Sequence, residues 1–309
     1  MKRLIMNRRI AIWFSVVLCV FLTGCSDKQT ENNVENITVN EDVVVSYLGP
    51  EGTYTQEAAQ LFFSDKASLI PCTTVTDAMN DVVESKSDYA VIPQENTIGG
   101  STSYVDALIS YEDLYVVGEV IIPINQTLMG IEGTTLNDIK TVCSHTQGIA
   151  QSEAWRKENL LNAQIQEMDS TAAAAKYVAE TKDKSIAAIA APGAAKLYGL
   201  SVIAENVQIS DTNKTRFYVL SLNPLKPEGH RYAVFVAECK ASIIDDIIVM
   251  IHQSGLELVT IHDRPAGDEL GSYRYIIEVE KETGIDSKII DKISSNEYIR
   301  YLGCFDVVE

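Results

Sequence analysis

Several signatures of metal and nucleotide chemistry are missing from this sequence. It contains no HExxH, no CxxC, no P-loop and no G-x-G-x-x-G segment. Its four histidines, at positions 145, 230, 252 and 262, do not have the spacing of metal ligands. We therefore expect a protein that binds no metal and uses no cofactor.

Basic residues are also scarce. Lys and Arg number 25 against 43 Asp and Glu, so the formal net charge is −18, and the acidic residues are spread along the chain. This balance argues against nucleic acid and against an anionic membrane surface as partners. An anionic substrate would need a local positive site to offset repulsion from the rest of the molecule.

Long apolar runs are absent except near the N-terminus, where residues 10–22 are mostly apolar and follow Lys2, Arg3, Arg8 and Arg9. The run is shorter than the roughly 20 residues of a membrane-spanning helix. It ends in Leu-Thr-Gly-Cys, which predicts a bacterial lipoprotein signal at residues 1–24 and a lipid on Cys25. The alternative is a short membrane anchor that is not cleaved.

Loss of residues 1–24 would leave a charge near −22 (−18 − 4). Residues 25–42 are polar and are predicted to be a flexible tether. We expect the mature protein outside the cytoplasm, lipid-anchored to a bacterial membrane.

Cysteines give little further information. Cys19 leaves with the signal, and Cys72, Cys143, Cys239 and Cys304 are widely spaced in the rest of the chain. A disulfide could form in an oxidising compartment, but the sequence does not select a pair.

The remaining chain is long enough for two domains. Residues 43–222 alternate strand and helix patterns in two lobes, each with polar residues where strands end. Pro224, Pro227 and Gly229 mark a linker at residues 223–229. Residues 230–309 change to a βαββαβ pattern, the order of a ferredoxin-like unit. The predicted class is therefore α/β with two lobes and a smaller C-terminal domain.

Polar residues at the ends of strands are the candidate site residues, because α/β sheets bind ligands there. Thr53 follows a Gly-rich turn and begins a helix, which makes either an anion site or an ordinary turn. His145 is interpreted as a turn or capping residue. The other candidates are Glu95, Asn96 and Ser101 after one strand, Ser144 and Gln151 near another, and Thr215 with Arg216 at the start of a third.

These segments resemble prephenate dehydratases. YLGPEGTYTQEAA, DYAVIPQENTIGGS, SHTQGIAQ, STAAAA, AAIAAPGAAKLYGL and TRF follow one another in the family's order. The C-terminal unit resembles the ACT regulatory domain that usually follows this catalytic domain. The resemblance covers residues 43–309 and implies a two-lobed catalytic domain similar to type II periplasmic binding proteins.

The resemblance implies a lyase that converts prephenate to phenylpyruvate, with loss of water and carbon dioxide, in phenylalanine biosynthesis. Prephenate is a dianion with a ring hydroxyl that is a poor leaving group, so the enzyme needs a hydrogen-bond donor at that oxygen. Thr215 is the family's essential hydroxyl, and Arg216 would hold a carboxylate or orient that hydroxyl. Substrate-binding roles fall to Thr53, Glu95, Asn96, Ser101, Ser144, Gln151 and Phe217.

Three departures from the family pattern stand out. Thr146 replaces the proline of Ser-His-Pro-Gln, and Lys240-Ala241-Ser242 replaces Gly-Ala-Leu. The family's Glu-Ser-Arg-Pro, which helps to form a phenylalanine site between subunits, becomes the candidate effector segment His262, Asp263, Arg264 and Pro265. The family implies phenylalanine as effector and a dimer or tetramer. No chorismate mutase domain is expected.

Two other classes remain open from the sequence. A solute-binding receptor for a carboxylate would also be a lipid-anchored, two-lobed protein outside the cytoplasm. A sensor that uses the C-terminal domain to bind an amino acid is the third reading.

Overall fold

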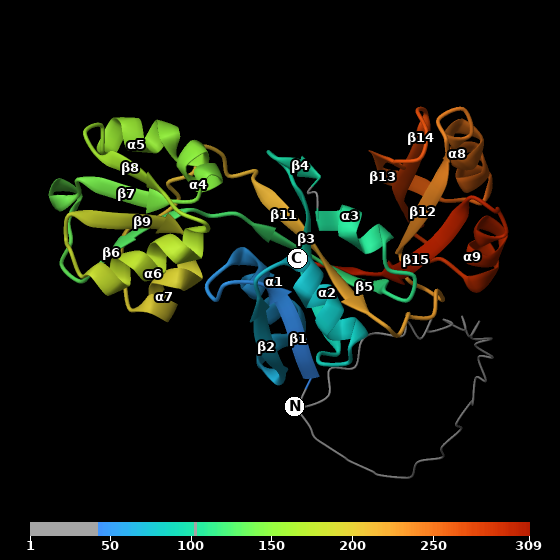
Figure 1. The fold of residues 1–309 in the computed structure, drawn as a ribbon, viewed down its shortest axis with the longest axis horizontal. Helices are drawn as coiled ribbons and strands as arrows, with labels where there is room; N and C mark the ends of the chain where they lie inside the picture. Colours follow the sequence, from blue (N-terminus) through green and yellow to red (C-terminus); the bar gives the residue numbers. More distant parts are fainter. Residues whose placement is uncertain (1–42, 102–103) are drawn as a thin grey trace, which may run out of the picture. The chain divides into compact units, whose positions relative to one another are not determined.

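The structure, a computed structural model, describes residues 43–101 and 104–309 (Figure 1). The predicted signal, tether and lipidated Cys25 lie outside the described residues. No helix within the described ranges is long and apolar enough to cross a membrane.

The described residues form two sheets. Eleven strands make the first: β1 (Val43–Leu48), β2 (Ala67–Cys72), β3 (Tyr89–Asn96), β4 (Gly100–Ser101), β5 (Tyr115–Pro123), β11 (Lys214–Ser221), β12 (Tyr232–Lys240), β13 (Glu257–Pro265), β14 (Ser272–Glu280), β15 (Ile299–Phe305) and β16 (Val307–Val308). Five make the second: β6 (Thr127–Gly130), β7 (Thr141–Ser144), β8 (Gln164–Glu167), β9 (Ile186–Ala190) and β10 (Ser201–Ala204).

Helices connect these strands. They are α1 (Tyr54–Phe63), α2 (Val75–Val83), α3 (Tyr104–Ile109), α4 (Thr146–Gln151), α5 (Glu153–Asn159), α6 (Thr171–Thr181), α7 (Pro192–Tyr198), α8 (Ile244–Gln253) and α9 (Ser287–Ser294). The predicted alternation of strands and helices is confirmed in both lobes of residues 43–222.

Strand β3 lies in the middle of the first lobe and is buried on both faces. Ala90 and Ile92 pack with Met79 of α2, whereas Val91, between them, packs with Ala58 of α1 on the other face. Successive side chains of a strand point to opposite faces, so a strand between two helix layers must be apolar on both sides. The continuous apolar run before Asn96 follows from this position.

The second lobe is built on small residues. Ala174 and Ala175 of α6 pack against Ala188 and Ala190 of β9. Alanine favours helix and lets the helix approach the sheet closely. Ser170 is the N-cap of α6, and its hydroxyl accepts the N–H of Ala173 at 2.9 Å.

The C-terminal unit has the predicted βαββαβ order, with its strands arranged β13-β14-β12-β15. Ile247 and Ile251 of α8 and Ile290 and Ile293 of α9 pack together against its sheet. This is the strand arrangement of a ferredoxin-like fold.

The C-terminal strands also extend the sheet of the first lobe, which the sequence did not indicate. β15 pairs with β5 in parallel at Gly303 and Val116, and β16 continues along β5. A Cβ on Gly303 would lie 2.0 Å from the Val116 carbonyl oxygen, and its φ of +144° disfavours other residues. A glycine is therefore required where the two strands meet.

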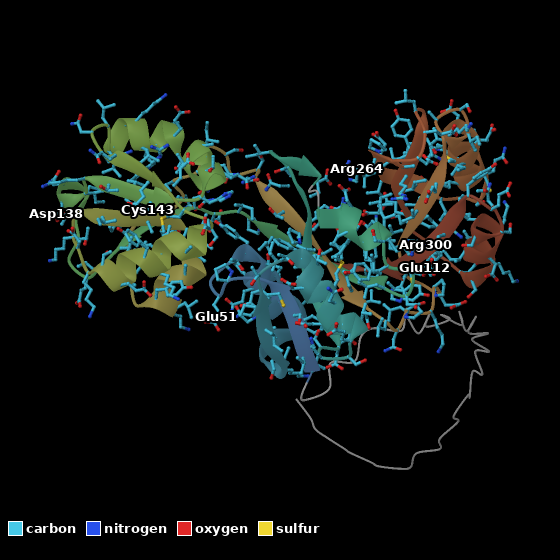
Figure 2. The ribbon with its side chains drawn as sticks, viewed as in Figure 1. Glu51, Glu112, Asp138, Cys143, Arg264 and Arg300 are labelled. Carbon is cyan, nitrogen blue, oxygen red and sulfur yellow. The ribbon has the colours of Figure 1, made fainter. Side chains whose placement is uncertain are left out.

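Two arginines of the C-terminal unit hold α3 (Figure 2). Arg264 Nε lies 2.6 Å from Asp106 Oδ1. Arg300 donates to the backbone oxygens of Ile109 and Tyr111 at 3.0 and 3.1 Å, at the end of the helix. Because carbonyl groups at a helix C-terminus lack intrahelical donors, Arg300 satisfies groups that would otherwise be unpaired.

The sequence left the pairing of four cysteines open. Cys72, Cys143, Cys239 and Cys304 are all buried, and no disulfide joins any two of these four residues.

Candidate functional site

A cavity of about 820 Å³ is lined by residues of the first sheet and by loops and the helices α4 and α6 of the second lobe. Of the residues that the sequence selected, its wall contains Thr53, Asn96, Gln151, Thr215 and Phe217. Other polar and small residues of the wall are Thr55, Gly99, Gly100, Gln126, His145, Gln147, Asp169, Ser170 and Thr171. Carboxyl ends of parallel strands converge in such sheets, which explains why segments far apart in sequence meet here. Its volume suits a small molecule.

Asn96 and Thr215 lie opposite each other on paired strands and share a hydrogen bond of known direction. The Asn96 side-chain oxygen accepts the backbone N–H groups of Ile98 at 3.0 Å and Gly99 at 2.9 Å. These two donors fix the amide orientation, so Asn96 Nδ2 must face Thr215 Oγ1, 2.9 Å away. An amide nitrogen only donates, and the Thr215 hydroxyl is therefore an acceptor that keeps its own proton free.

Thr215 is buried but its neighbourhood opens into the cavity. No acceptor for its hydroxyl proton is found among the described residues. The proton is thus available to a molecule in the cavity.

Asn213 was missed as a site residue. It is buried, and its side-chain oxygen accepts from Asn96 Nδ2 at 2.8 Å and from Thr97 Oγ1 at 3.3 Å. It lies in the Asn-Lys-Thr segment that looks like a turn in the sequence. A buried asparagine two residues before Thr215 supports the Asn96 amide from behind.

Gln126 was also missed. It lies just before β6, where the chain passes from the first sheet to the second, and is buried in the cavity wall. Its Nε2 donates to Gln151 Oε1 at 3.1 Å. The same rule that selected Asn96, a polar residue next to a strand end, would have found it. This hydrogen bond holds Gln151, one of the predicted substrate-binding residues, at the cavity wall.

Thr53 occupies the N-cap position of α1, but its side chain does not cap the helix. Its hydroxyl donates to the Leu48 backbone oxygen at 3.2 Å and makes no bond to the helix. The first N–H groups of α1 therefore remain without a side-chain cap beside the cavity. His145 caps α4, as predicted, since its Nδ1 accepts the Gln147 N–H at 3.3 Å.

Ser144 is not part of the cavity wall, which corrects its predicted position. It is fully buried at the end of β7, and its hydroxyl donates to the Ile189 backbone oxygen of β9 at 2.7 Å. This bond ties two neighbouring strands. Ser101 lies in β4, whose backbone pairs with Glu95, and its side chain is outside the described part of the structure.

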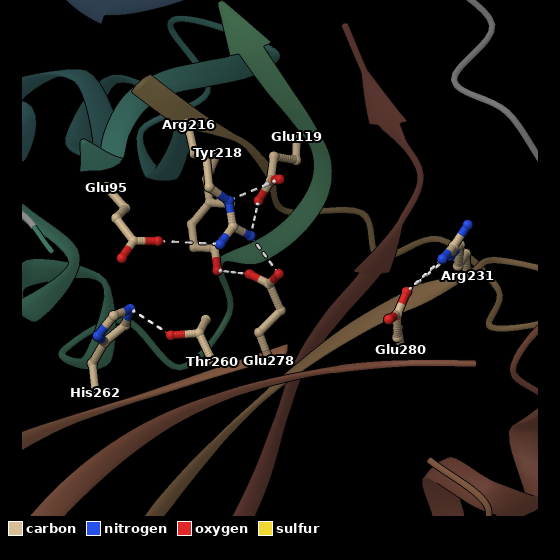
Figure 3. A network of polar contacts seen from close by, with 9 residues as sticks. All are labelled: Glu95, Glu119, Arg216, Tyr218, Arg231, Thr260, His262, Glu278 and Glu280. Atoms are coloured by element: carbon tan, nitrogen blue, oxygen red, sulfur yellow. Dashed lines mark hydrogen bonds and ion pairs between the residues drawn. The ribbon is translucent and has the colours of Figure 1, made fainter. Parts of the chain in front are cut away.

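Arg216 also lies outside the cavity wall, which argues against the first of its two predicted roles, holding a substrate carboxylate, and leaves the second, orienting the Thr215 hydroxyl, as a prediction. Neighbouring residues of a strand face opposite sides, so the strand that sends Thr215 and Phe217 into the cavity sends Arg216 away. Its Nη2 and Nε donate to Glu119 at 2.6 and 3.0 Å, and its Nη1 donates to Glu95 at 3.3 Å (Figure 3). Glu95 thus contacts the arginine, not the cavity.

The surroundings of Arg216 shift the pKa of Glu119. Burial, followed by the charge of Glu278, raises the pKa of Glu119 from 4.5 to about 7, although Arg216 opposes the shift. Burial alone would lower the pKa of the Arg216 guanidinium, but Glu119 and Glu278 raise it. Arg216 therefore stays charged.

The cavity wall contains no lysine or arginine among the described residues. Its one carboxylate is Asp169. Favourable interaction with an anion must come from helix N-termini and neutral donors, because the part of the wall that the structure describes holds no fixed cation.

The predicted effector segment lies along β13. Thr260 and His262 share a hydrogen bond of 3.1 Å, and burial lowers the pKa of His262. Arg264 is engaged by Asp106 of α3, while Asp263 and Pro265 end the strand. None of the four lines the 820 Å³ cavity.

Comparisons with known proteins agree with this arrangement. A family model described as prephenate dehydratase matches residues 45–224. The bifunctional chorismate mutase/prephenate dehydratase of Neisseria gonorrhoeae is 32% identical over 248 residues, which span 80% of this chain and 68% of that protein. The prephenate dehydratase of Methanocaldococcus jannaschii is 28% identical over 275 residues, or 86% of this chain and 98% of that one.

A solved structure gives the same result. The prephenate dehydratase of Arthrobacter aurescens in complex with L-Phe superimposes with a TM-score of 0.76 and 32% identity, over 85% of this chain and 90% of that one.

The raised pKa of Glu119 predicts a pH-dependent stability. Between its ordinary value of 4.5 and about 7, the folded protein holds a proton that the unfolded chain has released. The contribution of Glu119 to the free energy of unfolding is therefore complete at low pH and is lost as the pH rises through about 7. The unfolding temperature of the wild type should fall more between about pH 5 and pH 8 than that of Glu119→Gln.

Thermal unfolding at both pH values measures this difference. Glu238→Gln, which changes an exposed glutamate of β12, should keep the wild-type slope. If the unfolding temperatures of wild type and Glu119→Gln fall by the same amount between about pH 5 and pH 8, the raised pKa of Glu119 is contradicted.

Proposed function

The chain belongs to the prephenate dehydratase family and converts prephenate to phenylpyruvate, and we propose that the reaction takes place in the cavity around Thr215. The observation that carries the proposal is the directed bond from Asn96 to Thr215. It leaves one hydroxyl proton free in a cavity of suitable size, with no nucleophile or metal needed.

Thr215 donates its proton to the departing ring hydroxyl in this proposal. Hydroxide is a poor leaving group, so a hydrogen bond at that oxygen lowers the barrier as decarboxylation supplies electrons and the ring becomes aromatic. Threonine is a weak acid, and donation from Asn96 Nδ2 to its oxygen makes the hydroxyl a better donor. Asn213 holds Asn96 in place from the side away from the cavity.

The two substrate carboxylates are bound without a cation. We assign one to the free N–H groups at the start of α1, near Thr53, and the other to donors of the second lobe, near Gln151 and α6. Phe217 packs against the ring. Positioning of a dianion by fixed dipoles restricts its geometry before any bond breaks.

A receptor that binds a carboxylate without turnover is the less supported reading. It would account for two lobes and a cavity. It does not account for the Thr215 hydroxyl, whose proton stays free because the Asn96 amide donates to its oxygen. The family match covers the same residues.

Residues 1–24 are proposed to be a lipoprotein signal, with Cys25 carrying lipid and the enzyme lying outside the cytoplasm. The support is the sequence Leu-Thr-Gly-Cys after a short apolar run.

The βαββαβ unit is proposed to be an ACT domain that binds L-phenylalanine and mediates assembly into a dimer or tetramer. The similar Arthrobacter structure is described as a complex with L-Phe. β13 ends the sheet and pairs only with β14 among the described strands, so its outer edge could pair with another subunit.

Thr215→Ala should lower kcat about 100- to 1,000-fold, the usual effect of losing one donor to a developing negative charge. Folding should be unaffected because only a hydroxyl and a methyl group are lost. Phenylpyruvate formation from prephenate is the readout. Thr212→Ala, at an exposed neighbouring threonine, should retain wild-type turnover. Normal turnover by Thr215→Ala would reject the assignment.

Asn96→Asp tests the direction of the hydrogen bond. The new carboxylate can still accept from Ile98 and Gly99, but its other oxygen cannot donate to Thr215 and would take the hydroxyl proton instead. We expect kcat to fall about 100-fold, close to the loss in Thr215→Ala. Unfolding temperature and KM report whether the fold persists. A folded variant with unchanged kcat would show that the Thr215 proton is not directed by Asn96.

Lipidation can be tested with the full chain in a bacterial host fed a labelled fatty acid. The label should attach to the wild type and be lost in Cys25→Ala, which should no longer sediment with membranes. Equal labelling of both proteins would exclude Cys25 as the lipid site.

A further inference from the structure

Glu278 joins the C-terminal unit to β11, the strand that carries Thr215. It lies on β14, and its carboxylate accepts from Arg216 Nη2 and, at 2.8 Å, from the Tyr218 hydroxyl (Figure 3). Arg216 and Tyr218 are two residues apart on the face of β11 away from the cavity. A single carboxylate therefore bridges both residues, and Phe217 lies between them.

The cluster is a weak source of stability. The Glu119 and Glu278 side chains are each 1% exposed and that of Arg216 is 17% exposed. Moving such ions out of water costs several kcal/mol for each, and apolar replacements of buried ion groups are often at least as stable. Here one guanidinium also faces three carboxylates, counting Glu95. Orientation, not stability, is the property that such a costly cluster can supply.

The backbone of β11 makes its side-chain directions sensitive to these contacts. Its pairing with β3 shifts register between Arg216 and Phe217, so the ladder is locally interrupted on that side. Thr215 and Arg216 are adjacent on one strand, so a shift of the strand backbone at Arg216 also moves Thr215. An anchor on the outer face therefore sets how Thr215 and Phe217 enter the cavity.

We propose that Glu278 is a positioning residue for the dehydratase reaction, acting through Arg216 and Tyr218 on the direction of the Thr215 hydroxyl. The proposal rests on the proposed role of Thr215. It makes the geometry of the reaction dependent on a residue of the C-terminal unit that does not line the substrate cavity.

Glu278→Gln tests the proposal in the full chain, because it keeps the shape and the Tyr218 contact but removes the charge. kcat should fall about 10- to 100-fold, the scale expected from a small misplacement of a reacting group, with KM changed by less than about threefold. Glu280→Gln is the matched control. Glu280 lies two residues further along β14 and pairs with Arg231 at 2.8 and 2.9 Å. It should have wild-type kinetics.

A double mutant identifies the route of the effect. If Glu278 acts through Thr215, Glu278→Gln should lower the residual rate of Thr215→Ala no further. A full additional loss in the double mutant, or equal kinetics for Glu278→Gln and Glu280→Gln, would overturn the proposal.

Folding and the reaction itself are checked separately. If Glu278→Gln does not fold, Tyr218→Phe removes one half of the same bridge, and it should lower kcat with KM unchanged; an unchanged kcat there would overturn the proposal. A wild type without prephenate turnover would instead reject the reaction proposed for the cavity.

Discussion

The alternation of side chains along β11 is the constraint on which the site depends. Four consecutive residues divide between two surroundings: Thr215 and Phe217 line the cavity, while Arg216 and Tyr218 enter a cluster of buried carboxylates. The hydroxyl and the cation that stand side by side in the sequence therefore have separate tasks. The hydroxyl faces the substrate, and the cation holds β11 against β3, β5 and the C-terminal unit.

A protein of charge −18 that binds a dianion would seem to need an arginine in its cavity. The described cavity wall has none, and backbone N–H groups at a helix start and side-chain amides remain as donors. Fixed dipoles have an advantage for this reaction. They do not lose side-chain entropy on binding, and they leave the region of the leaving oxygen to one directed donor.

Much of the fold followed from the sequence because its patterns are local. The alternation of strands and helices in residues 43–222 and the βαββαβ order depend on neighbouring residues, and both are confirmed. The separation of Thr215 from Arg216 also follows from strand geometry, yet the resemblance drew both into one site. The Asn213 and Gln126 contacts were not readable, since each depends on a partner far away in sequence. Glu119 and Glu278 did carry a signal, since each is a carboxylate between apolar strand residues, but only tertiary structure shows that Arg216 joins them.

The most direct test is the turnover of prephenate by the purified wild-type protein near neutral pH. Phenylpyruvate is followed by its absorbance in alkali, against a control without enzyme because prephenate decays spontaneously in acid. The free hydroxyl proton of Thr215 predicts saturable formation of phenylpyruvate without an added metal or cofactor. Tight binding of prephenate with no rate above the control would contradict the account and identify a binding protein.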